Sequence, residues 1–239
     1  MRKELEQDPG RSDARRKAAR ERAAREREAR VAEALKQYAD VKKKKKHDKD
    51  DARVSTTDPD ARKMRMADGG TRPAYNVQLS TDTETQIIVS VDVINGGSDF
   101  DQLVPAMQRM NKQHGTTPKE LLVDGGFAKR DAIEEAAEAP FNCTVYAPLP
   151  KPTTKAQTVE RPFKTETPRV TEWRERMATA EAKAIYKERA ATIECVNAQA
   201  RNRGLQQFRV RGRPKVKAVA LMFALVHNIV RAKSLKKAG

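Results

Sequence analysis

Hydrophobic and polar residues alternate along two neighbouring stretches near the middle of the chain. Residues 74–82 and 85–95, AYNVQLSTD and TQIIVSVDVIN, are rich in β-branched residues, and only a short polar link separates them. Alternation with a period of two is typical of strands, and a short link between two such stretches favours antiparallel pairing. We therefore expect a β-hairpin here.

After the hairpin, apolar residues recur at helical spacing. A helix is predicted from the candidate N-cap Ser98 onward, and it tolerates Pro105 only within its first turn. Short apolar runs at 120–124 and 141–150 predict two more strands, with a helix over 128–138 between them. The order β-β-α-β-α-β indicates an α/β fold with a mixed sheet.

The two ends of the chain are predicted to be helical. Residues 11–40 consist mostly of Ala, Arg and Glu, so we expect a solvated helix there, followed by a basic linker. Residues 171–203 predict helix with a break near Ala190, and a last helix runs from Lys215 to about Lys233. Its expected buried stripe consists of Val216, Val219, Ala220, Phe223, Val226 and Val230. Residues 56–73 and 150–170, rich in turn-forming residues, are expected to be irregular.

Charge is distributed unevenly along the sequence. The chain has a net charge of +16, of which residues 1–53 contribute +7, residues 54–170 contribute −2 and residues 171–239 contribute +11. This distribution predicts a folded domain, residues 54–239, that meets a polyanion, with residues 1–53 as a charged appendage. Nucleic acid is the first candidate and an anionic membrane surface the second. No segment approaches the ~18 consecutive apolar residues that a membrane span needs.

Metal-binding and redox motifs built from Cys or His are not expected. Cys143 and Cys195 lie far apart and form no CxxC, which is typical of reduced thiols in a cytosolic protein. The three histidines are scattered and predict no zinc site. Trp173 is a candidate for stacking on DNA bases or for packing in the core.

Two carboxylates are candidates for chemistry. Asp124 ends an apolar strand, where α/β folds place their sites, although capping of the next turn is an alternative role. Glu194 is the last acid, and eleven Lys or Arg residues follow it. It either pairs with Lys187 or Arg201 on one helix face, or it holds a cation among bases that hold phosphates. We predict that Asp124 and Glu194 bind Mg²⁺ (or Mn²⁺), which prefers one or two carboxylates plus water and phosphate oxygens.

Several blocks of sequence occur in a fixed order over about residues 54–235: STTDPDARKMRMADGGTRPAYNVQLSTDTETQIIVSVDV, LLVDGGF, YKERAATIECVNAQARNRGLQQFRVRG and ALVHNIVR. Together they resemble the catalytic domain of bacterial insertion-sequence transposases of the DDE type. The resemblance implies a ribonuclease-H-like mixed sheet flanked by helices, in which three acids hold two Mg²⁺ ions. It also implies Mg-dependent DNA strand cleavage and strand transfer at insertion-sequence ends.

The resemblance assigns individual residues. By match of motif, Asp124 corresponds to the family's second acid and Glu194 to its third. Tyr186, Arg189 and Arg201 correspond to the Tyr, Arg and Lys of the family's Tyr-Arg-Glu-Lys signature, with one extra residue between Arg189 and Glu194. The residues expected to bind DNA phosphates are Tyr186, Arg189, Arg201, Arg203, Arg209 and Arg211.

The family's first acid has no counterpart. It lies in a stretch like Asp-Gly-Thr-Lys on the first strand, and residues 1–54 contain no such stretch. Asp82 and Asp92 are available, but Asp82 is expected in a hairpin turn. We therefore expect a sheet without its first, central strand. On this view the chain is an N-terminally truncated DDE transposase with an incomplete active site, poorly active alone.

Two other functions remain open at this point. One is a non-catalytic DNA-binding remnant that binds transposon ends, and the other is a basic RNA-associated protein. The expected partner is double-stranded DNA, with a second copy of the chain or an intact transposase as further candidates. A cytoplasmic, nucleoid-associated location and no membrane are expected.

Overall fold

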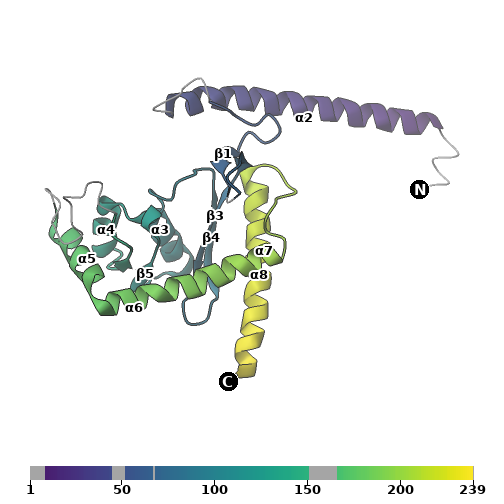
Figure 1. Ribbon diagram of the computed structural model, residues 1–239. Coiled ribbons are helices and arrows are strands. Elements are labelled where there is room, and N and C mark those ends of the chain that lie inside the picture. The colour runs from purple at the N-terminus through teal and green to yellow at the C-terminus, as the bar shows by residue number, and fades with distance from the viewer. Residues whose placement is uncertain (1–8, 45–51, 67, 151–165, 239) are drawn as a thin grey trace. The chain divides into compact units, whose positions relative to one another are not determined.

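A computed structural model describes residues 9–44, 52–66, 68–150 and 166–238 (Figure 1). The chain divides into two units. The first comprises Met1–Tyr75 with Val210–Lys215, and the second comprises Asn76–Arg209 with Val216–Gly239. Most of the loop expected over 150–170, and much of the basic linker, lie outside the described residues.

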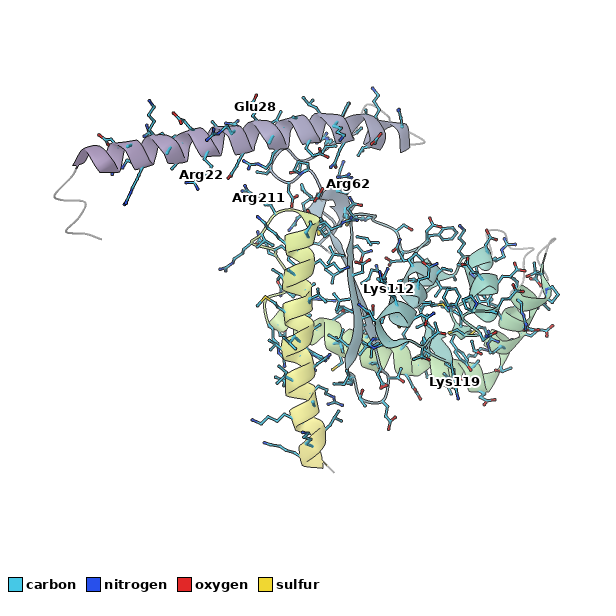
Figure 2. All side chains as sticks on the ribbon, turned by 180° about the vertical axis from the view of Figure 1, so that it is seen from behind. Arg22, Glu28, Arg62, Lys112, Lys119 and Arg211 are labelled. Carbon is cyan, nitrogen blue, oxygen red and sulfur yellow. The ribbon has the colours of Figure 1, made fainter. Side chains whose placement is uncertain are left out.

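The first unit contains a long helix and a short hairpin. The described side chains of helix α2 (Pro9–Lys44) are mostly exposed, as its Ala, Arg and Glu composition predicts. Strands β1 (Arg62–Arg65) and β2 (Thr71–Ala74) pair antiparallel. The prediction of loop and turn alone for this stretch was wrong, because Gly69, with φ of +80°, allows a tight turn that lets the polar flanks pair. Arg62, labelled in Figure 2, also donates to Gln37 on α2 at 2.6 Å.

Two carboxylates of the turn before β1 bind the start of the last helix. Asp58 accepts hydrogen bonds from Tyr75 Oη at 2.8 Å and from Gly212 N–H at 3.2 Å. Asp60 accepts from Arg213 N–H at 2.9 Å. The first N–H groups of a helix lack partners within it, and its N-terminus favours negative charge. The two carboxylates therefore cap this helix.

The second unit contains the hairpin predicted from alternation. Strands β3 (Asn76–Thr81) and β4 (Ile88–Ile94) pair antiparallel, with Val77 opposite Val93. The hairpin prediction is confirmed, and Asp82 lies in its turn, where its N–H donates to Ile87 O at 2.9 Å.

Two further strands form a separate pair. Strands β5 (Glu120–Leu122) and β6 (Thr144–Tyr146) are parallel. The α/β class is confirmed, but the expected continuous mixed sheet is not formed. Among the described residues there are three two-stranded sheets, because no described strand joins β3 to β5.

Helices cover these strands and build the core. The bounds are α3 (Leu103–His114), α4 (Arg130–Ala137), α5 (Pro168–Ala178) and α6 (Ala180–Arg189). The N-cap of α3 is Gln102 rather than the predicted Ser98, whose hydroxyl accepts from Phe100 N–H instead. Pro105 lies in the first turn of α3, as its missing N–H requires.

Trp173 lies at the centre of the core. It is fully buried with Leu103, Met107 and Ile133, and its indole N–H donates to Ala147 O at 3.1 Å. Base stacking by Trp173 is therefore excluded. The alternative, packing in the core with its polar atom satisfied, is confirmed.

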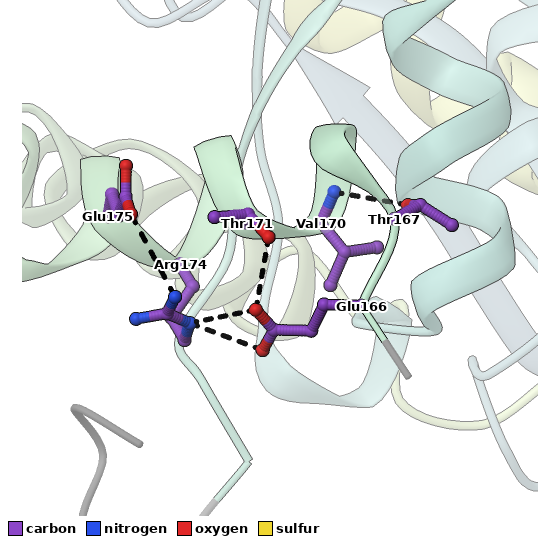
Figure 3. Close-up of polar contacts among 6 residues, drawn as sticks. All are labelled: Glu166, Thr167, Val170, Thr171, Arg174 and Glu175. Atoms are coloured by element: carbon purple, nitrogen blue, oxygen red, sulfur yellow. Dashed lines mark hydrogen bonds and ion pairs between the residues drawn. The ribbon is translucent and has the colours of Figure 1, made fainter. Parts of the chain in front are cut away.

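Helix α5 begins with a dense set of polar contacts (Figure 3). Thr167 caps the helix by accepting from Val170 N–H at 3.4 Å. The nearly buried carboxylate of Glu166 accepts from Arg174 Nε at 3.2 Å and from the Thr171 hydroxyl at 3.1 Å. Burial of a charge is costly unless it is paired and hydrogen-bonded, and both conditions hold here.

Helix α8 (Arg213–Ala238) packs along the β3–β4 hairpin from Val216 onward (Figure 1). The Asn228 side chain binds both the N–H and the C=O of Ile88 at 2.8 Å. His227 is buried and its Nε2 lies 2.9 Å from Gln86 O, so it is a histidine of the core. The predicted stripe was partly wrong, since Val226 is 53% exposed. By length and composition alone, α8 would also be long and apolar enough to cross a membrane.

Candidate metal and DNA site

A cleft of about 580 Å³ lies between β3 and β5 in the second unit. Its lining includes every residue of both strands, side chains of α3, and the end of α6 with the segment that follows it. The polar side chains considered below are Asn76, Gln78, Asp99, Asp124, Arg189 and Glu194.

Asp124 lies two residues beyond the end of β5. Its Oδ1 accepts from Gly126 N–H at 2.8 Å and so caps the short 3₁₀ turn η2 (Gly125–Phe127). The capping role considered from the sequence is therefore present. The second carboxylate oxygen has no hydrogen-bond partner in the described part of the chain and remains available to a ligand.

Gly126 marks a close approach between two acids. A Cβ at this position would lie 2.9 Å from Asp124 Oδ1 and 3.7 Å from Asp99 Cβ. The first distance is shorter than van der Waals contact allows, so a side chain here would displace the Asp124 carboxylate. Glycine therefore keeps Asp124 in place beside Asp99.

Asp99 was not identified as a site residue from the sequence. It accepts from Asn76 Nδ2 at 2.6 Å and from Gln78 Nε2 at 2.7 Å. The only signal was the placement of two amides on one face of a strand, which alone does not identify their acceptor. The three side chains form a polar cluster on the wall of the cleft.

Glu194 reaches the same cleft from a distant part of the chain. It is exposed and lines the cleft together with Asp124, 70 positions earlier. The alternative role, an ion pair with Lys187 or Arg201, is not observed among the described residues. The Glu194 carboxylate is thus free to bind a cation.

The segment before Glu194 is a turn of π-helix. Segment η3 (Ala190–Glu194) joins α6 to α7 (Cys195–Asn202). A π-turn has i→i+5 hydrogen bonds and accommodates one more residue than an α-turn. The extra residue between Arg189 and Glu194 is absorbed here, and both side chains still line the cleft.

Arg189 is oriented by Tyr186. Its Nε donates to Tyr186 Oη at 3.1 Å, and its guanidinium carbon lies 5.6 Å from the ring centroid. Tyr186 packs against the core, so the pair presents a positive charge to the cleft from a fixed base. This geometry suits the binding of a phosphate oxygen.

The other predicted phosphate ligands lie outside the cleft. Arg201, Arg203 and Arg209 are exposed in the second unit, and none of them lines the cleft. Arg211 (Figure 2) is exposed in the first unit. The sequence did not identify Arg109, which lines the cleft and pairs with Asp92 at 3.1 Å.

The described side chains of the cleft supply only some of the ligands that a divalent ion needs. Within the described ranges, no group of three or more His, Cys, Asp or Glu side chains is placed to hold a metal. Two carboxylates are nevertheless compatible with Mg²⁺, which commonly completes its shell with water and phosphate oxygens.

Part of the chain matches a known protein family. A family model described as Transposase DDE domain matches residues 137–232, a segment that includes Glu194 but not Asp124. This confirms the resemblance for the C-terminal part of a DDE transposase domain. No curated protein and no solved structure gives a significant match.

Proposed function

We propose that this protein acts in DNA transposition, with a divalent metal ion bound by Asp124 and Glu194, because residues 137–232 match a family model described as Transposase DDE domain. The fold that we propose is ribonuclease-H-like, with strands β3 to β6 as part of its sheet. The proposed location is the cytoplasm, in contact with the nucleoid.

One observation carries the proposal. Asp124 and Glu194 are far apart in sequence, yet both line one cleft, and each keeps at least one carboxylate oxygen without a partner among the described residues. Uncompensated carboxylates in one cleft repel each other and any phosphate, unless a cation lies between them. Mg²⁺ or Mn²⁺ would activate a water or a 3′-hydroxyl and stabilise the leaving oxygen.

The protein's own residues supply binding and orientation. Asp124 is positioned by Gly126, Glu194 by the π-turn, and Arg189 by Tyr186. In this proposal Arg189 holds a phosphate oxygen of the strand at the cleft. Arg201, Arg203, Arg209 and Arg211, which do not line the cleft, contact other DNA phosphates.

A binding function without catalysis is the second candidate. It is favoured by the lack of a third clustered acid among the described residues. With two carboxylates, the metal is held weakly and DNA cleavage by the chain alone is expected to be poor. Both candidate functions include DNA binding, but only the first requires a metal ion bound by Asp124 and Glu194.

A measurement of metal binding distinguishes the two candidate functions. Mn²⁺ binding, followed by electron paramagnetic resonance, is expected to weaken at least tenfold in Asp124→Asn and in Glu194→Gln. Asparagine retains an acceptor for Gly126 N–H, so the first variant removes charge without removing the cap. Glu181→Gln, an exposed acid of α6 outside the cleft, is the matched control. Unchanged Mn²⁺ affinity in both site variants would leave the DNA-binding function.

A further inference from the structure

One face of helix α8 is apolar and exposed. Its large side chains Leu221, Met222, Leu225, Val226, Ile229 and Val230 are 44–68% exposed. The opposite face of the helix, which carries Val216, Ala220 and Ala224, is buried. Single exposed apolar residues are ordinary, but a contiguous group of this size on one helix is typical of an interaction surface.

Residues along the middle of this face have the spacing of a contact between two helices. They follow one another at alternating steps of three and four: Lys215, Ala218, Met222, Leu225, Ile229, Ala232 and Lys236. Every one of them is exposed. Such steps place residues in one narrow stripe, as the a and d positions of coiled coils do. We call this stripe the α8 seam.

The α8 seam has nearly the same order of residues in both directions. Its large residues lie at the centre, with Ala218 on one side, Ala232 on the other and a lysine at each end. An interface about a two-fold axis uses the same surface on both subunits, so that surface must fit itself. The order of the seam meets this requirement if the two helices are antiparallel.

The exposed apolar area is close to what a dimer needs. At roughly 100 Å² for each large side chain, a pair of copies would bury on the order of 1,200 Å². Specific, stable interfaces bury about 1,200–2,000 Å² in total. The seam is therefore sufficient for a weak dimer, with an expected Kd on the order of 10 µM.

We propose that α8 pairs with the α8 of a second copy of this chain, antiparallel, about a two-fold axis between Met222 and Leu225. Met222 of one copy then faces Leu225 of the other, and Ala218 faces Ile229. A large side chain opposite a small one allows the two seams to interdigitate. The pairing requires neither a metal ion nor DNA.

Charge predicts how this dimer responds to salt. Both ends of α8 are basic, and the helix contains no acid. Antiparallel pairing brings the start of one helix near the end of the other, so the two copies repel each other there at low salt. Because salt screens this repulsion, the dimer should become stronger as salt rises. An acidic protein partner on the same face would instead bind more weakly.

Sedimentation equilibrium of the full chain tests the dimer. Between about 0.1 and 0.5 M NaCl the dimer Kd should fall at least about threefold. Met222→Gln and Leu225→Gln should each raise it at least about tenfold. The matched control is Phe100→Gln, which replaces an apolar residue 49% exposed elsewhere in the second unit and should leave the Kd unchanged. A monomer at all concentrations up to about 200 µM, twenty times the expected Kd, would overturn the proposal. An equal loss in Phe100→Gln, or a dimer that weakens as salt rises, would also overturn it.

Site-directed cross-linking tests the orientation. In the proposed register Lys215 of one copy faces Ala232 of the other, so a short bismaleimide should join Lys215→Cys to Ala232→Cys when the two variants are mixed. Both variants keep the apolar centre of the seam, and both carry Cys195→Ser to remove the accessible native thiol. Neither variant alone should be joined to itself, because its two copies of the new thiol lie about 25 Å apart along the axis. Self-linkage of either variant, or no linkage in the mixture, would overturn the antiparallel pairing.

Discussion

The phenol of Tyr75 is held in its neutral form by its surroundings. Partial burial, the hydrogen bond to Asp58, and the negative charges of Asp58 and Asp60 together raise its pKa above the ordinary value. A group with a raised pKa stabilises the fold fully below its unfolded pKa, about 10 for tyrosine. That stability is lost as pH rises through the window between the unfolded and folded pKa values.

We therefore expect the free energy of unfolding to decrease as pH rises above about 10, and Tyr75→Phe to reduce this decrease. Chemical denaturation followed by circular dichroism at several alkaline pH values measures it. Tyr38→Phe is the control, because Tyr38 is exposed. An identical pH dependence in Tyr75→Phe and the parent protein would contradict the assignment.

The two thiols differ in environment, and we expect them to differ in reactivity. Burial and the nearby Glu120 raise the pKa of Cys143 to about 11, with Arg176 opposing this. Since the thiolate is the reactive form, iodoacetamide near pH 8 should modify Cys195, which is only half-buried, and spare Cys143. Mass spectrometry of the native protein should show one adduct, and of the denatured protein two. Rapid modification of Cys143 in the native state would contradict its burial.

Sequence reasoning identified side chains whose roles depend on near neighbours. The Asp-Gly-Gly pattern predicted the capping role of Asp124, because its cap partner lies two residues away. It did not identify Asp99, because its partners Asn76 and Gln78 lie 23 and 21 positions earlier on a strand. A long-range polar contact leaves no periodic signal in the sequence.

At the scale of elements, the π-turn before Glu194 accommodates the extra residue between Arg189 and Glu194. Deleting exposed Ala191 should convert η3 into a regular α-helical turn, with Arg189 and Glu194 still on one face. We expect the free energy of unfolding to change by less than about 1 kcal/mol. Mn²⁺ affinity should also be retained.

The control deletes Ala184 within regular α6. That deletion rotates the first part of α6 relative to the cleft and removes buried Ala182 from the core. We expect it to lower the free energy of unfolding by at least about 2 kcal/mol. Thermal and chemical unfolding measure both changes. Equal losses in the two deletions would show that the π-turn absorbs no extra residue.

The buried face of helix α8 was predicted only partly correctly from the sequence. It is apolar on nearly all sides between Val219 and Val230, so periodicity does not single out its buried face. The hydrogen bonds of Asn228 and Arg231 with the β3–β4 hairpin fix its orientation instead. The alternating β3–β4 hairpin had a clear period and was predicted correctly.

A pair of adjacent residues tests this orientation. Ala224 is buried at 6% exposure, whereas Leu225 is 62% exposed. Ala224→Leu should destabilise the protein by about 1–3 kcal/mol through overpacking. Leu225→Gln should change stability by no more than about 0.5 kcal/mol. The reverse order in chemical denaturation would place the other face of α8 against the hairpin.

At the scale of the whole molecule, charge governs the expected response to salt. If about five phosphates are contacted, log K for duplex DNA should fall with log salt at a slope near −4.5. Fluorescence anisotropy over a range of salt concentrations measures it, and a slope near zero would contradict DNA binding. Single Arg→Gln changes at Arg201, Arg203 and Arg209 should each reduce the slope by about one.

The order of helices and strands could be predicted from the sequence, but the pairing of the strands into sheets could not. Local patterns predicted the β-β-α-β-α-β order of the second unit. Whether β3 and β5 share a sheet depends on a strand between them, and no property of either strand contains that information. The short pairing of β1 with β2 was missed for a related reason, since polar strands carry no hydrophobic alternation.

The capping of the last helix by Asp58 and Asp60 has a consequence for biosynthesis. These carboxylates meet Gly212 and Arg213 across 154 and 153 positions of sequence. A growing chain emerges from the ribosome N-terminus first. The Asp58 and Asp60 carboxylates therefore cannot bind Gly212 and Arg213 during most of translation. The second unit is largely contiguous, but its last segment, Val216–Gly239, emerges later still. The part of the molecule made first is thus among the last to be completed.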